Sequence, residues 1–143
     1  MTARPERDQT VEDVMTSGPT SIANDAPVVE AARRMASEDV GSLPVVDGDR
    51  VVGIVTDRDL VLQVMAKELD PNEIHVSDVC SERPVTAEPG EQLDAALERM
   101  AKERVRRLPV VLDGRLVGIL AQADVARAAT VESTGRLVEE ISE

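Results

Sequence analysis

Residues 43–55 read LPVVDGDRVVGIV, two runs of branched aliphatic residues on either side of an Asp-Gly pair. Such runs around a short turn containing glycine predict a β-hairpin, here with its turn at Asp47-Gly48 and its second strand over Val51–Val55. The same pattern returns at residues 108–120, which read LPVVLDGRLVGIL. The sequence therefore predicts two similar hairpins in one chain.

The likeness of the two hairpins belongs to a longer repeat. Shifted by 65 positions, Val11–Leu60 aligns with Val76–Val125 without a gap, and 19 of the 50 aligned pairs are identical. A unit of about 60 residues buries a poor core on its own. We therefore expect two copies of one unit that pack against each other.

Each copy also carries helical patterns around its hairpin. A short extended segment, Pro19–Ile22 or Pro84–Ala87, comes first. A helix follows, with Asp25 as its N-cap and Pro27 in its first turn. A second helix follows the hairpin; in the second copy it lies around Ala123–Ala129. The apolar stripes that predict these helices are Val28, Ala31, Ala32 and Met35; Leu93, Ala96, Leu97 and Met100; and Leu60, Val61, Val64 and Leu69.

The order of these elements gives the fold class. Each unit reads β-α-β-β-α, which is a mixed α+β unit, and the two units are expected to be related by a pseudo-twofold axis. We expect them to span residues 8–69 and 74–131, because Asp70-Pro71-Asn72 interrupts the helical pattern between them. Residues 132–143 predict a tail helix with an apolar side. Thr10 and Asp13 predict a capping box on an N-terminal helical turn.

Composition restricts the possible partners. The chain has 143 residues, 16 Lys and Arg against 28 Asp and Glu, and a formal net charge of −12. This charge repels a phosphate backbone, and the absence of Phe, Tyr and Trp removes stacking platforms, so nucleic acid is not an expected partner. The single cysteine excludes an internal disulfide. Without a membrane-spanning or signal-like apolar run, we expect a cytoplasmic protein that does not bind membranes.

Three motifs carry a family resemblance. Asp13-Val14-Met15-Thr16, Leu43-Pro44-Val45-Val46-Asp47 and the stretch from Gly53 to Leu60 resemble a CBS domain. Their recurrence in the same order resembles a tandem CBS pair, or Bateman module, over about residues 8–130. The chain is similar to the stand-alone CBS-pair proteins of bacteria, and in particular to small actinobacterial CBS proteins of the hypoxia response. Within these 143 residues we therefore expect no further catalytic, transporter or DNA-binding domain.

The resemblance implies a regulatory ligand rather than a cofactor. CBS pairs bind AMP, ADP, ATP or S-adenosylmethionine between the two copies, and the family signature is Gly-apolar-x-Thr/Ser-x-x-Asp. The first copy supplies Gly53, Ile54, Thr56 and Asp59. The signature lies where a strand ends and a helix begins, so free N–H groups, a hydroxyl and a carboxylate can meet phosphate and ribose. In the second copy Ala121 replaces the hydroxyl residue, and this puts that site in doubt.

In the family each site combines the signature of one copy with an aliphatic adenine pocket from the other. The resemblance therefore implies two sites. The residues of the stronger one are Ile54, Thr56, Asp59, Arg83, Val85, Val105, Arg106 and Arg107. The residues of the weaker one are Gly18, Thr20, Val40, Gly41, Ile119 and Asp124. Arg107 stands where some members of the family place a phosphate-binding arginine, and an anionic ligand needs such a local reversal of sign.

Other interpretations of these residues remain open. Thr56 and Asp59 are also common helix caps, and adjacent arginines are often solvated or paired with acids. Cys80 fits a packing residue, and a zinc site made by His75, Cys80 and carboxylates across a dimer is the alternative. We expect no resident metal.

Three classes of function compete at this point. The first is a module that senses an adenosine-containing ligand and signals to a regulated protein, which the sequence does not identify. The second is an interaction protein with vestigial sites. The third, an enzyme, lacks any Ser-His-Asp, Cys-His or paired-acid constellation, so no catalytic residue is expected. Apolar helix stripes left uncovered by the two units predict a homodimer.

Overall fold

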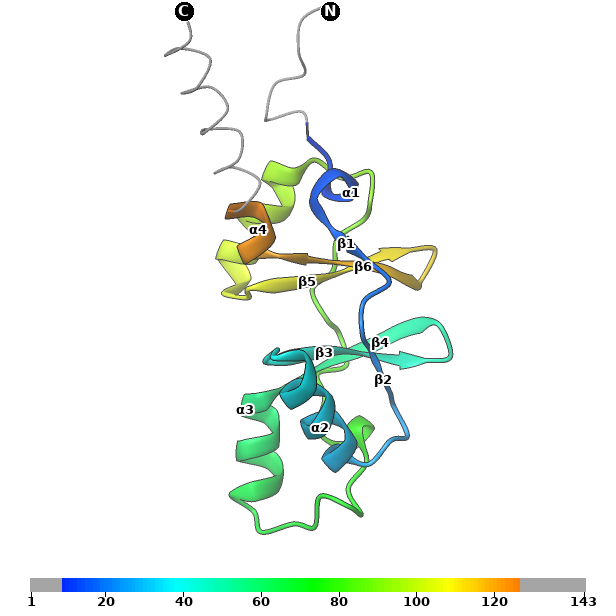
Figure 1. Ribbon diagram of the computed structural model, residues 1–143, viewed down its shortest axis with the longest axis vertical. Coiled ribbons are helices and arrows are strands. Elements are labelled where there is room, and N and C mark those ends of the chain that lie inside the picture. Colours follow the sequence, from blue (N-terminus) through cyan, green and yellow to red (C-terminus); the bar gives the residue numbers. More distant parts are fainter. Residues whose placement is uncertain (1–8, 127–143) are drawn as a thin grey trace, which may run out of the picture.

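The computed structural model describes residues 9–126 (Figure 1). The first unit contains β2 (Ile22–Ala23), α2 (Val28–Glu38), β3 (Ser42–Asp47), β4 (Arg50–Thr56), α3 (Asp57–Leu60) and a π-helical turn (Val61–Met65). The second contains α4 (Leu93–Glu103), β5 (Arg107–Leu112), β6 (Arg115–Ala121) and helical residues 122–126. Two short elements, α1 (Val11–Val14) and β1 (Thr16–Ser17), precede the first unit, and a 3₁₀ turn (Val76–Asp78) precedes the second. The predicted tail helix, 132–143, lies outside the described residues.

The two hairpins obey the repeat in every detail of their pairing. Leu43 lies opposite Val55 in β3–β4, and Leu108 lies opposite Leu120 in β5–β6, so the register is the same after the shift of 65. Both hairpins also carry an irregularity at the same place, between Val45 and Val46 and between Val110 and Val111. The predicted pair of α+β units is confirmed.

The turn of the first hairpin differs from the sequence prediction by one residue, and that of the second hairpin does not. Because Asp47 still pairs with Arg50, the turn of the first hairpin is Gly48-Asp49 rather than Asp47-Gly48. Gly48 has a φ of +65°, so the glycine takes the first central position, as in a type II′ turn. In the second hairpin Asp113 and Gly114 both have positive φ, as in a type I′ turn.

The start of α2 also differs from the prediction. The N-cap of α2 is Pro27, not Asp25, and it has no side-chain cap. The first free N–H groups of this helix donate instead to the backbone: Val28 N to the carbonyl of Ile74 at 2.8 Å, and Val29 N to that of Pro71 at 3.0 Å. A backbone carbonyl from the linker does the work of a capping side chain.

The extended segments before these helices are shorter than predicted. Only Ile22–Ala23 forms a strand, parallel to β3, and Ala87 makes a single parallel bridge to Val110. The buried residues of the helices follow the predicted stripes, except that Ala32, Val61 and Leu69 face solvent. Thr10 and Asp13 form the predicted capping box, with Thr10 N donating to Asp13 Oδ2 at 2.9 Å.

Each unit is completed by the segment that precedes the other. In β1, Thr16 pairs with Ile119 of β6, and Val11 of α1 is fully buried in the core of the second unit. In the same way Ser81 bridges Ile54 of β4, and Val76 is fully buried in the core of the first unit. This exchange gives each small unit more core and ties the two together.

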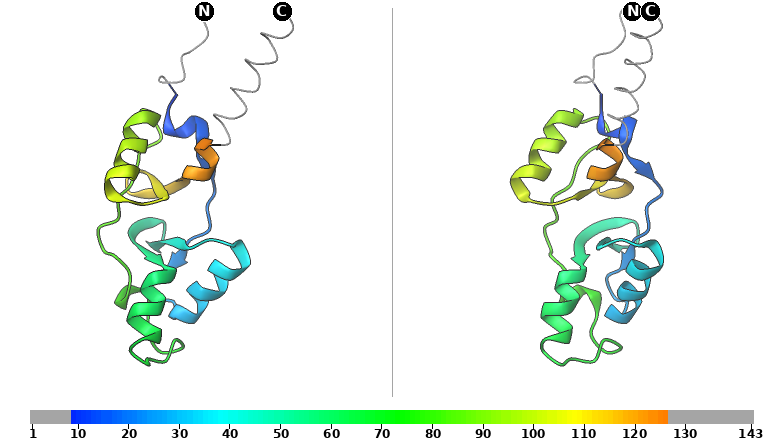
Figure 2. Two further views of the ribbon diagram at one scale, coloured as in Figure 1. Left: turned by 90° about the vertical axis from the view of Figure 1, so that its left-hand side faces the viewer. Right: turned by 60° about the vertical axis from the view of Figure 1, so that its left-hand side comes forward.

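The two hairpins lie in the middle of an elongated molecule, and the longer helices lie towards its two ends (Figures 1 and 2). The strands form one six-stranded sheet in the order β1-β6-β4-β3-β2, with β5 also paired to β6. The hairpins meet at their tips, where Arg50 pairs with Arg115 and Val51 N donates to the carbonyl of Gly114 at 3.0 Å. Within the described residues, none of the helices is long and apolar enough to span a membrane.

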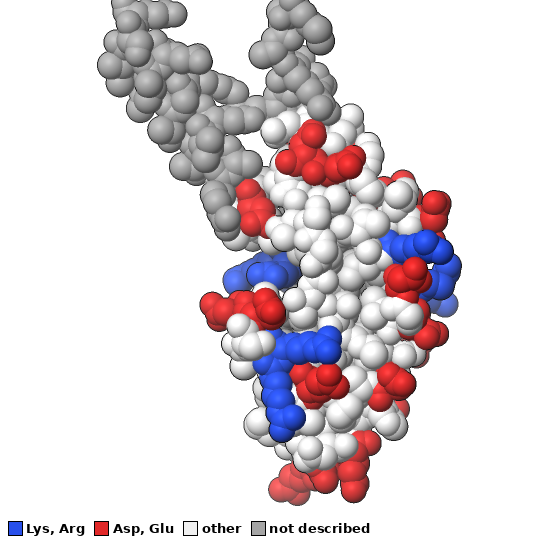
Figure 3. All heavy atoms as spheres, turned by 45° about the vertical axis from the view of Figure 1, so that its right-hand side comes forward, with Lys and Arg blue, Asp and Glu red and all other residues white. Residues whose placement is uncertain are grey.

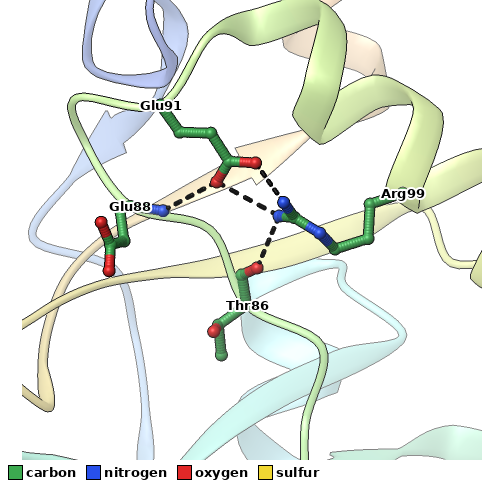
Figure 4. A network of polar contacts seen from close by, with 4 residues as sticks. All are labelled: Thr86, Glu88, Glu91 and Arg99. Carbon is green, nitrogen blue, oxygen red and sulfur yellow. Dashed lines mark hydrogen bonds and ion pairs between the residues drawn. The ribbon is translucent and has the colours of Figure 1, made fainter.

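An arginine on each long helix holds the extended segment that precedes it. Arg99 Nη1 donates to the carbonyl of Thr86 at 2.8 Å, and the same guanidinium pairs with Glu91, whose Oε2 also accepts from Glu88 N at 3.2 Å (Figure 4). The hydrogen bond to Glu91 raises the pKa of Arg99. In the first unit the aligned Arg34 donates to the carbonyl of Ser21 and pairs with Glu30.

We expect Arg99→Ala to lower the free energy of unfolding by about 2 kcal/mol, the scale of a charged hydrogen bond that is partly shielded. The Glu91 side chain is only 17% exposed. The matched variant Arg34→Ala should cost about 1 kcal/mol or less, because the side chains of Arg34 and Glu30 are 42% and 44% exposed. Urea unfolding followed by far-UV circular dichroism measures both. A greater loss for Arg34→Ala would contradict this ranking.

Candidate ligand-binding clefts

A cavity of about 370 Å³ lies between the units and collects most of the predicted weaker site. Its walls come from the linker after β1, the start of β3 and the end of β6. Five of the six predicted residues line it: Gly18, Thr20, Val40, Ile119 and Asp124. The sixth, Gly41, lines a different cavity.

The smaller cavity combines an apolar wall with one oriented carboxylate. Pro19, Val40, Pro44 and Ile119 supply aliphatic surface. Asp124 stands in the first turn of helical residues 122–126, and its Oδ2 accepts a hydrogen bond from Thr16 Oγ1 at 3.2 Å. A carboxylate beside an aliphatic slot can accept hydroxyl donors of a ligand whose flat part fills the slot.

A second cavity of about 660 Å³ collects part of the predicted stronger site. Five of its eight predicted residues line the cavity: Ile54, Thr56, Val105, Arg106 and Arg107. Arg58 and Arg104 line it as well, so four guanidinium groups meet two carboxylates, Asp39 and Asp57. On the face drawn in Figure 3, the basic side chains lie mostly along the middle of the molecule, and acidic ones reach both ends.

Asp59 lines neither of these two cavities. Its Oδ2 accepts a hydrogen bond from Thr56 N at 2.9 Å, while Thr56 Oγ1 accepts one from Asp59 N at 3.1 Å. This reciprocal pair is a complete capping box at the start of α3. Thr56 and Asp59 therefore act as helix caps, which is the other interpretation of the signature. A ligand that binds Asp59 would compete with the backbone N–H of Thr56 for this carboxylate.

Arg83 and Val85 also lie outside both cavities. They belong to the segment between the bridges at Ser81 and Ala87, where Arg83 is exposed and Val85 half-buried. This segment explains Gly53: a Cβ on that residue would lie 2.4 Å from the carbonyl oxygen of Ser81. The space beside Gly53 is filled by the chain's own backbone.

Sequence reasoning missed Arg58 and Arg104 as lining residues. Arg58 lies inside the quoted signature, between its threonine and its aspartate. Arg104 ends α4 in the left-handed region, at a φ of 58°, as the aligned Asp39 ends α2 at 54°. In the sequence, the replacement of the acidic Asp39 by the basic Arg104 at the aligned position was the signal that could have pointed to Arg104.

The potential metal ligands are not gathered together. Cys80 is half-buried against the first core, and burial raises the pKa of its thiol. His75 is exposed, and its Nδ1 lies 3.9 Å from Asp78 Oδ2. Across the residues that the structure describes, no three His, Cys, Asp or Glu side chains form a group able to hold a metal ion. Cys80 thus has the surroundings of a packing residue.

Comparison with known proteins accounts for this architecture. The CBS domain family matches residues 11–66 and 76–130. Hypoxic response protein 1 of Mycobacterium tuberculosis is 35% identical over 119 residues, which cover 82% of this chain and 83% of that protein. Its crystal structure with two coordinated zinc ions has a TM-score of 0.77 and covers 83% of this chain and 98% of that one.

Two further structures contain adenosine compounds. CBSX2 in complex with AMP is 31% identical, with a TM-score of 0.76 and coverage of 87% of this chain and 98% of that one. The CBS pair of MJ0100, in complex with 5-methylthioadenosine and S-adenosyl-L-methionine, is 27% identical, with a TM-score of 0.73 and coverage of 84% and 98%. The repeat, the paired hairpins and these matches agree: the chain belongs to the CBS domain family, as a tandem pair.

Proposed function

We propose that this protein is a regulatory sensor that binds an adenosine-containing ligand between its two CBS units and signals its state to a partner protein. AMP, ADP, ATP and S-adenosylmethionine are the candidate ligands. One observation carries the proposal: both units contribute to a cavity that combines an aliphatic slot with the Asp124 carboxylate. The complexes of CBSX2 and of MJ0100 support the ligand class.

The chemistry of the smaller cavity suits a nucleoside. Val40 and Ile119 can cover the two faces of a purine, as aromatic residues do elsewhere. Asp124 can accept both ribose hydroxyls, and Arg107 supplies positive charge for a phosphate. The sequence ranked the Thr56–Asp59 site first; the geometry favours the Asp124 site, because Asp124 lines the smaller cavity and Asp59 lines neither of the two.

The remaining expectations form part of this proposal. The units are assigned to residues 8–69 and 74–131, and the protein acts in the cytoplasm as a homodimer without catalysing a reaction. The alternative, an interaction protein with vestigial sites, draws support from Ala121, which removes a hydroxyl from the second signature. Ligand binding separates the two.

The test is calorimetric titration with AMP, ADP, ATP and S-adenosylmethionine, since the chain lacks aromatic fluorescence. We expect Asp124→Ala to weaken the binding of the preferred ligand by about tenfold to a hundredfold, the value of a charged acceptor for two hydroxyls. Asp59→Ala should chiefly lower the free energy of unfolding, by about 1 kcal/mol for a lost cap.

The control is Asp94→Ala, which removes an exposed carboxylate of α4 that lines neither cavity. It should leave affinity unchanged. If none of the four ligands binds the unsubstituted protein, the sensor function is wrong and the interaction protein takes its place. A larger loss of affinity from Asp59→Ala than from Asp124→Ala would restore the ranking that the sequence gives.

A further inference from the structure

Three residues line both cavities: Val40, Ser42 and Arg107. The two polar ones, Ser42 and Arg107, occupy aligned positions of the repeat. Ser42 begins β3 and Arg107 begins β5, and each lines the smaller and the larger cavity. Ser42 pairs with Thr56 at the end of β4, and Arg107 pairs with Ala121 at the end of β6. Besides the aliphatic Val40, the wall common to the two cavities thus holds one neutral hydroxyl and one guanidinium.

The two cavities depend on that guanidinium to different degrees. Among the described residues that line the smaller cavity, Arg107 is the one cation, set against Glu38 and Asp124. The larger cavity has three further arginines: Arg58, Arg104 and Arg106. A phosphate in the smaller cavity has one strong partner, whereas a phosphate in the larger cavity can choose among several.

We propose that Arg107 is a phosphate-recognition residue shared by the two sites, so that phosphate-bearing ligands compete for it while uncharged nucleosides do not. A phosphate bound in the larger cavity draws on the positive charge that the smaller cavity needs. The coupling is reciprocal, as linkage requires. The smaller site then prefers a phosphorylated ligand when the larger site is empty and loses that preference when it is full. This inference rests on the proposed function and adds a form of regulation to it.

The two cavities carry their own spectroscopic reporters. Ile119 lines the smaller cavity and Ile54 the larger. Selective labelling of isoleucine δ1 methyl groups therefore lets a single NMR titration follow each site separately. The probes are AMP and adenosine, which differ only by the phosphate.

We expect Arg107→Ser, which copies the residue at the aligned position 42, to weaken AMP binding at both reporters. The loss should be about tenfold at Ile119 and about threefold at Ile54, while adenosine affinity stays within about twofold at each. The matched control is Arg106→Ser, because Arg106 lines the larger cavity and not the smaller. It should weaken AMP at Ile54 alone.

The reverse substitution tests the sharing directly. Ser42→Arg places a second guanidinium on the common wall, and it should tighten AMP at Ile119 when the larger site is saturated, by about fivefold. The proposal that the two sites share Arg107 would be overturned by either of two results. One is a loss of AMP affinity in Arg107→Ser that is seen at one methyl group alone, and the other is an equal loss of adenosine affinity. If neither AMP nor adenosine shifts either methyl of the unsubstituted protein, the sensor function itself fails.

Discussion

Gly53→Ala is expected to lower the free energy of unfolding by about 3 kcal/mol, at the upper end of the usual cost of forcing atoms into a packed site. The new Cβ would lie 2.4 Å from the carbonyl oxygen of Ser81 and 3.0 Å from Cys80 Sγ. The oxygen belongs to backbone that cannot move alone, because Ile54 N donates to it at 3.1 Å and Ser81 N donates back to the carbonyl of Ile54 at 2.9 Å. The substitution therefore pushes the exchanged segment off β4.

Two other glycines provide matched controls. At the aligned Gly118 the nearest atom to a new Cβ is Met15 Sδ at 2.5 Å, and a flexible thioether can turn away, so Gly118→Ala should cost less. At Gly90 nothing lies within 4 Å, and Gly90→Ala should be neutral or stabilising by about 0.5 kcal/mol. Urea unfolding by far-UV circular dichroism gives the three values. A Gly53→Ala cost no larger than that of Gly90→Ala would show that the exchanged segment does not press on β4.

The elements that the sequence predicted are those encoded locally. The hairpins follow from runs of branched aliphatic residues around a short turn, and the helices follow from apolar residues at helical spacing. The repeat then fixed the pseudo-symmetry, since the same residues in the same order must fold alike. The turn was misplaced by one residue because both Asp47-Gly48 and Gly48-Asp49 are good turn pairs, and only the pairing of Asp47 with Arg50 decides.

The exchange of segments could not be predicted from local patterns. Val11 and Val76 are each the first residue of a short helical turn, and nothing in their own stretch says which core will bury them. The same holds for Asp25, a good N-cap by type. It lost that position because the carbonyl of Ile74, distant in sequence, already accepts from the first N–H of the helix.

For the site, the sequence supplied residue types but not their competing partners. The resemblance pointed to Thr56 and Asp59, and these two residues satisfy each other. The second signature, weakened by Ala121, retains a carboxylate that lines a cavity. Which cavities share a wall depends on how the two units face each other, so the place of Arg107 in the lining of both cavities could be seen only in three dimensions.

Self-association should be abolished at micromolar concentration by Leu62→Arg combined with Met65→Thr. Four exposed apolar residues follow α3: Val61, Leu62 and Met65 lie in the π-helical turn, and Leu69 lies beyond it; we call these four the stripe. Met65 is 73% exposed. Residues 60–69 carry one Lys and one Glu, so two copies of this face can meet without the repulsion that a net charge of −12 would otherwise cause. We therefore propose this stripe as the contact of the homodimer that is part of the proposed function.

The two substitutions copy the residues at the aligned positions of the second copy, Arg127 and Thr130. A twofold interface contains each residue twice, and burying one Leu or Met contributes about 1.5–3 kcal/mol, so the dissociation constant should rise at least about a hundredfold. The molar mass from light scattering should be about twice 15.4 kDa for the unsubstituted protein and about 15.4 kDa for the double variant.

Leu112→Asp is the control for this experiment. It removes an exposed leucine from the tip of the second hairpin, and aspartate already stands at the aligned position 47. The control should remain dimeric. A monomeric unsubstituted chain would refute the dimer. Dissociation by Leu112→Asp alone would move the interface to the hairpin tips. If the double variant alone dissociates, the contact belongs to the first unit, because polar residues, Arg127 and Thr130, stand at the aligned positions of the second copy. Ligand occupancy would then reach the interface through α3, whose N-cap Thr56 lines the larger cavity.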